Sequence, residues 1–83
     1  MIKPHILFDN NNLSIKIKNF VKKKLGHYAI AKSDLIVVIG GDGFMLWSLK
    51  KYYKYNKNFY GINSGNYGFL MNKFSTKHTL NNL

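Results

Sequence analysis

Residues 36–43, with the sequence Ile-Val-Val-Ile-Gly-Gly-Asp-Gly, decide the fold of this 83-residue chain. The first four are apolar and β-branched without any polar alternation, which is typical of a parallel strand buried on both faces. Three glycines then surround Asp42, so few side chains would keep a ligand from the backbone. A carboxylate at the carboxyl end of such a strand lies where open α/β sheets bind ligands. The alternative is an ordinary strand-to-helix turn in which Asp42 caps the next helix.

The sequence on either side predicts an alternation of strands and helices. Apolar residues recur every three or four positions from 13 to 25 with lysines between them, which indicates a helix with one buried face. A second helix is predicted at 44–53, and strands are predicted at 5–8, 35–39 and 59–62. This order predicts an α/β fold with a Rossmann-like parallel sheet, flanking helices and right-handed crossovers. The segment 27–32 is ambiguous and fits a short strand and a turn.

A second glycine-rich loop, NSGNYG, occupies residues 63–68 directly after the third predicted strand. Parallel strands end at the same edge of a sheet, so both glycine loops are predicted to open there. Two such loops at one edge are typical of a nucleotide site, which favours a ligand over a simple turn. We therefore expect a nucleotide-binding α/β domain at residues 1–72 and a polar segment at 73–83.

The composition limits the classes of function. The net charge is +10, but all thirteen cationic residues are Lys, and base-specific contacts favour Arg. A dedicated RNA- or DNA-binding module is therefore disfavoured, although tyrosines interleave with the lysines. The chain contains no cysteine, which excludes disulfides and thiolate metal sites and fits a cytoplasmic location. Its apolar runs are too short to cross a membrane.

Two motifs resemble those of the NAD kinases. Residues 40–46, GGDGFML, resemble the GGDG signature of that family, and residues 61–70, GINSGNYGFL, resemble its second glycine element. Lipid kinases and phosphofructokinases carry relatives of the first motif but not of the second. The resemblance is close from 34 to 72. It implies the N-terminal portion of an NAD kinase fold, without the all-β C-terminal domain of the family.

The resemblance also implies roles for single residues. Asp42 corresponds to the carboxylate that accepts the proton of the 2′-hydroxyl of the adenosine ribose of NAD, which then attacks the terminal phosphate of ATP or polyphosphate. Gly41, Gly43 and Leu46 correspond to NAD contacts, and Phe69 to an aromatic residue beside the adenine ring. The resemblance also implies a divalent cation, with Mg²⁺ as the first choice. Phosphate oxygens and water would hold this ion, rather than a cluster of side chains.

The chain departs from the family in two positions and in its length. Phe44 replaces the usual Thr, and Trp47 stands where many relatives have Arg or His. NAD kinases are much longer and commonly form homo-oligomers, so we expect these 83 residues to be inactive alone. Two alternatives are a non-catalytic nucleotide-binding fragment that assembles with a partner chain and a lipid kinase of the GGDG superfamily.

Overall fold

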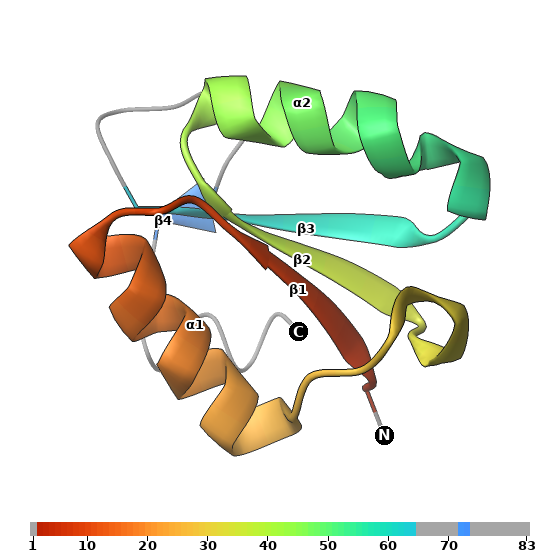
Figure 1. The fold of residues 1–83 in the computed structure, drawn as a ribbon, viewed down its shortest axis with the longest axis horizontal. Helices are drawn as coiled ribbons and strands as arrows, with labels where there is room; N and C mark the ends of the chain where they lie inside the picture. Colours follow the sequence, from red (N-terminus) through yellow and green to blue (C-terminus); the bar gives the residue numbers. More distant parts are fainter. Residues whose placement is uncertain (1, 65–71, 74–83) are drawn as a thin grey trace.

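The computed structural model describes residues 2–64 and 72–73, and these form one parallel sheet with a helix on each face (Figure 1). The strand order is β1-β2-β3-β4, and every neighbouring pair is parallel. The predicted α/β class with a parallel sheet and flanking helices is therefore confirmed. The elements are β1 (Pro4–Phe8), α1 (Asn12–Leu25), η1 (Ile30–Lys32), β2 (Leu35–Gly40), α2 (Asp42–Tyr52), η2 (Tyr53–Tyr55), β3 (Asn58–Asn63) and β4 (Asn72–Lys73).

Strand β2 forms the centre of the core. Its four β-branched residues are all 0% exposed, and they alternate between the two faces of the sheet. Val37 and Ile39 pack with residues of α1, whereas Ile36 and Val38 pack with residues of α2. Both faces of β2 are thus apolar, which explains why its sequence lacks polar alternation.

Helix α1 has a defined start and end. The Asn11 side chain accepts a hydrogen bond from the backbone N–H of Ser14 at 2.8 Å, as N-cap residues commonly do. At the other end Gly26 adopts a φ of 83°, a left-handed value that favours glycine, and donates to the Lys22 carbonyl at 2.8 Å. Ile17 and Val21 lie on the buried face between these ends, as the apolar spacing predicted.

The two helices lie on opposite faces of the sheet (Figure 1). Simple right-handed crossovers between neighbouring strands taken in order would place both on one face. The difference arises in the segment after α1, where the Tyr28 N–H donates to the Pro4 carbonyl at 2.9 Å and the Ile6 N–H donates to Nδ1 of His27 at 3.1 Å. After α1 the chain therefore runs along the edge of β1 that faces away from β2. It then crosses to β2 through η1, and Ile30 of η1 packs on the same face of the sheet as α2.

The partial burial of the His27 ring makes the stability of the fold depend on pH. Burial lowers the pKa of His27 from its ordinary value of 6.5, and the charges of His5, Lys22 and Lys18 lower it further. Below that ordinary value the unfolded chain binds the proton more readily than the folded chain does, so protonation favours unfolding. We therefore expect the free energy of unfolding to fall as the pH is lowered through 6.5, the ordinary pKa of histidine.

Urea denaturation followed by circular dichroism across this pH range measures the effect. The His27→Asn variant is the control, because its side-chain oxygen can accept the Ile6 N–H but does not titrate. Wild type should lose more stability at acid pH than this variant. An equal loss in both proteins would contradict the role given to His27.

Candidate functional site at the carboxyl edge of the sheet

The ends of β1, β2 and β3 meet at one edge of the sheet. Phe8 pairs with Ile39, and Gly40 pairs with Asn63, so the three strands end level with one another. After these strands the chain continues on opposite faces of the sheet: α1 follows β1 onto one face, and α2 follows β2 onto the other (Figure 1). The gap between the ends of β1 and β2 is therefore a topological switch point, where open α/β sheets bind their ligands.

Hydrogen bonds fix the neighbouring loops to the end of β2. The Asp9 N–H, directly after β1, donates to the Ile39 carbonyl at 2.8 Å. The Ser64 N–H, directly after β3, donates to the Gly40 carbonyl at 3.1 Å. The hydroxyl of Ser64 also contacts the hydroxyl of Ser14 in the first turn of α1. These contacts connect the ends of all three strands at this edge.

The three glycines of the β2–α2 turn serve different purposes. A Cβ added to Gly40 would lie 2.8 Å from Cδ2 and 3.1 Å from Cβ of Phe44, so packing requires a glycine there. A Cβ added to Gly41 or Gly43 would meet no described atom within 4 Å. Gly41 also has an extended backbone, with φ −102° and ψ −175°, which other residues adopt readily. Within the part of the chain that the structure describes, the space beside the residues before and after Asp42 is therefore open.

Alanine at each glycine separates packing from ligand access. We expect Gly40→Ala to reduce the free energy of unfolding by about 1–3 kcal/mol, because the new methyl group overlaps Phe44. Gly41→Ala and Gly43→Ala should change it by less than about 1 kcal/mol, since their methyl groups enter open space. Urea denaturation of the three variants measures this difference, and equal losses at all three positions would contradict it.

Asp42 is the first residue of α2, and its side chain is partly exposed. Gly41 occupies the N-cap position without a side-chain hydrogen bond, and the Met45 N–H donates to its carbonyl at 3.0 Å. The alternative in which Asp42 is the capping residue is therefore wrong. The first N–H groups of a helix attract anions, so this turn places a carboxylate beside amides suited to phosphate oxygens.

The chain is similar in sequence to curated proteins from Rickettsia. The NAD kinase of Rickettsia peacockii (strain Rustic) is 38% identical to it over 78 residues, which are 94% of this chain and 31% of the relative. The NAD kinases of Rickettsia rickettsii (strain Sheila Smith) and Rickettsia prowazekii (strain Madrid E) are 37% and 36% identical over the same shares of the two chains. The chain is similar to a part of the NAD kinases. No family model matches it.

The resemblance in the two glycine motifs is thus confirmed, and it extends over nearly the whole chain. The chain spans about a third of the length of the NAD kinases it matches, because the aligned residues are 31% of each relative.

The structure brings together most of the residues implied as NAD kinase site residues. Gly41 lies between β2 and α2 at the switch point, and Asp42 and Gly43 are the first two residues of α2. Leu46 lies one helical turn after Asp42, on the same face of α2, and is 50% exposed despite its apolar side chain. Phe69 lies outside the described residues, as do Gly65 and the rest of the second glycine motif after Ser64.

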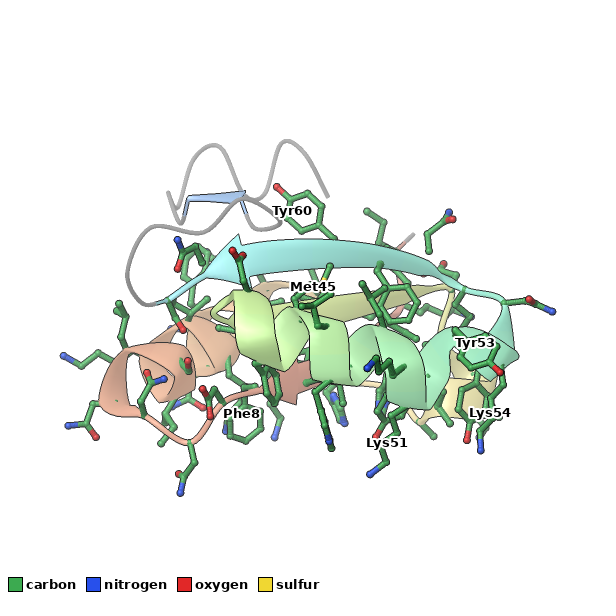
Figure 2. The ribbon with its side chains drawn as sticks, turned by 90° about the horizontal axis from the view of Figure 1, so that it is seen from above. Phe8, Met45, Lys51, Tyr53, Lys54 and Tyr60 are labelled. Atoms are coloured by element: carbon green, nitrogen blue, oxygen red, sulfur yellow. The ribbon has the colours of Figure 1, made fainter. Side chains whose placement is uncertain are left out.

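Phe44 and Trp47, which differ from the motif that the resemblance implies, stack against each other. The rings of Phe44 and Trp47 are 5.5 Å apart at 20°, and the Lys51 amine lies 4.9 Å from the Trp47 ring centre. Trp47 is nevertheless 49% exposed. Figure 2 shows that Lys51, Tyr53 and Lys54 gather toward the end of α2 and η2, away from Phe8 at the end of β1.

Two further properties concern only the described part of the chain. Within residues 2–64 and 72–73, no three His, Cys, Asp or Glu side chains come close enough together to hold a metal ion. No helix in these same residues has the length and the apolar character needed to span a membrane.

Sequence reasoning missed two features of this edge. The switch point depends on the path of residues 27–28 along β1, which has no hydrophobic pattern of its own. The contact between Ser14 and Ser64 joins residues that are 50 positions apart, and serine is ordinary in both contexts. No signal in a single sequence would have identified either one.

Proposed function

We propose that this chain carries the catalytic carboxylate and one side of the NAD site of an NAD kinase. The observation that supports this most directly is the position of Asp42 at the switch point, between two glycines whose added Cβ atoms would meet open space. The similarity to curated NAD kinases over 94% of the chain supports NAD as the substrate that receives the phosphoryl group. The donor is ATP or polyphosphate, and the product is NADP.

In the proposed reaction Asp42 acts as general base. A ribose hydroxyl is a weak nucleophile, and an oriented carboxylate can take its proton as the new bond to phosphorus forms. The 2′-oxygen then gains the phosphoryl group, the bond from that phosphorus to the rest of the donor breaks, and the proton remains on Asp42. The first N–H groups of α2 would bind phosphate oxygens beside it.

Leu46 and Phe69 complete the proposed contacts to NAD. The exposed Leu46 side chain, on the same helix face as Asp42, is suited to cover apolar parts of the dinucleotide. Phe69 is proposed to lie against the adenine ring, which needs a flat apolar partner. We also propose a cytoplasmic enzyme that is a homo-oligomer at full length.

The proposed reaction requires a divalent cation such as Mg²⁺. The phosphate oxygens of the donor and water are proposed to hold it, since Mg²⁺ commonly keeps several waters and binds substrate phosphates. When bound, the ion neutralises charge on the phosphates of the donor.

A chimeric enzyme tests this function. The 83 residues replace the matching stretch of the Rickettsia peacockii NAD kinase, which is 38% identical, and NADP formation from NAD and ATP or polyphosphate is measured. We expect activity in the chimera and none in the isolated chain. A folded chimera that forms no NADP would contradict the proposal.

A second candidate follows from the 31% coverage of the relatives. The chain could act as a nucleotide-binding fragment that assembles with a separate partner chain. Mixing it with the remaining part of the relative, produced as a second polypeptide, tests this. Recovery of NADP formation on mixing supports assembly, whereas activity only in the covalent chimera excludes it.

A further inference from the structure

The hydroxyl contact between Ser14 and Ser64 joins α1 to the loop that follows β3. Ser14 is 0% exposed and Ser64 is 5% exposed, so water has little access to either hydroxyl. The backbone of each residue is fixed separately, because the Ser14 N–H donates to the Asn11 side chain and the Ser64 N–H donates to the Gly40 carbonyl. Ser64 is therefore bonded to α1 through its hydroxyl and to Gly40, at the end of β2, through its N–H.

We propose that Ser14 is a positioning residue for the nucleotide site. Its hydroxyl fixes Ser64, directly after β3, and Ser64 in turn is bonded to Gly40 at the start of the β2–α2 turn. This inference rests on the proposed function of that site. In this proposal Ser14 acts through Ser64, the residue that its hydroxyl contacts.

The physical reason is that a buried hydroxyl needs a partner. Without the Ser14 hydroxyl, the Ser64 hydroxyl would stay buried and lose the partner it has in the structure, which is unfavourable. The loop would relieve this by moving Ser64 toward another partner or toward water. Because the Ser64 N–H is bonded to Gly40, such a movement would reach the turn that carries Asp42.

Steady-state kinetics of the chimera test the inference. We expect Ser14→Ala and Ser64→Ala each to raise the KM for NAD about three- to tenfold, the worth of one hydrogen bond, with a smaller change in kcat. The double variant should unfold at a higher urea concentration than Ser14→Ala, because no hydroxyl is left without its partner. Its KM should nevertheless stay raised, which a purely structural role would not produce.

Ser33→Ala is the matched control. Ser33 is also 5% exposed, and its hydroxyl donates to the Ile30 carbonyl at 2.9 Å, but it precedes β2 at the opposite edge of the sheet. This variant should lose stability and keep the wild-type KM. A wild-type KM in Ser14→Ala, or an equal rise in Ser33→Ala, would overturn the inference.

A measurement on the 83-residue chain separates this inference from the proposed function. Amide chemical shifts of Gly41 and Gly43 should change in Ser14→Ala and remain unchanged in Ser33→Ala. If the wild-type chimera forms no NADP, the proposed function fails, and these shifts still decide whether Ser14 controls the turn. Unchanged shifts in Ser14→Ala would overturn the coupling itself.

Discussion

Replacing Asp42 with Asn in the chimera is expected to slow NADP formation by about 10²–10⁴-fold, the usual contribution of a positioned general base. The amide has nearly the shape of the carboxylate but cannot accept the proton of the ribose hydroxyl. Because the change affects the transition state more than substrate binding, the KM for NAD should change far less than kcat. Initial rates over a range of NAD concentrations separate the two constants.

Asp34→Asn provides the matched control for this variant. Asp34 directly precedes β2, so it lies at the opposite end of the strand from Asp42, and it accepts a hydrogen bond from the Lys3 N–H at 2.9 Å. This variant should keep the wild-type kcat. An Asp42→Asn enzyme with near wild-type kcat would show that another group removes the proton.

Shortening Ile39 to Ala should cost about 2–5 kcal/mol of the free energy of unfolding. Ile39 is 0% exposed in the central strand and packs with Ile6, Ile17 and Ile62, so its loss leaves a cavity between β2 and α1. A domain of this size has only about 4–12 kcal/mol of stability in total. The variant is therefore expected to be largely unfolded in mild urea.

Leu46→Ala is the comparison for Ile39→Ala. Leu46 is 50% exposed, so the same kind of truncation should change stability by no more than about 0.5 kcal/mol. Urea denaturation followed by circular dichroism measures both variants. Similar losses in the two would mean that β2 is not the centre of the core.

Local patterns predicted most of the secondary structure correctly. The unbroken β-branched run predicted a strand buried on both faces, and the helix expected at 13–25 extends from Asn12 to Leu25. The second helix begins at Asp42, two residues earlier than predicted, because helical backbone geometry tolerates Gly43 in its first turn. Burial and periodicity determine these elements, and both can be read from neighbouring residues.

Long-range features could not be predicted in the same way. The placement of α1 and α2 on opposite faces follows from the path of residues 27–28 along β1, where His27 and Tyr28 form hydrogen bonds with Pro4, His5 and Ile6. In the sequence Gly40 also looked equivalent to Gly41 and Gly43. Of these three positions, only Gly40 must be a glycine for Phe44 to pack beside it. The sequence therefore predicted a site at this edge of the sheet, whereas only the structure shows how Asp9 and Ser64 are bonded to the end of β2.

The central claim, that a dinucleotide binds at the switch point beside Asp42, is tested most directly by titrating the ¹⁵N-labelled 83-residue chain with NAD. Amide shifts should change at Gly41, Asp42 and Gly43, and the changes should be reduced in the Gly41→Ala variant, whose methyl group occupies the open space. Tyr53, at the other end of α2, should remain unaffected. Shifts confined to that far end, with none at the three turn residues, would contradict the account.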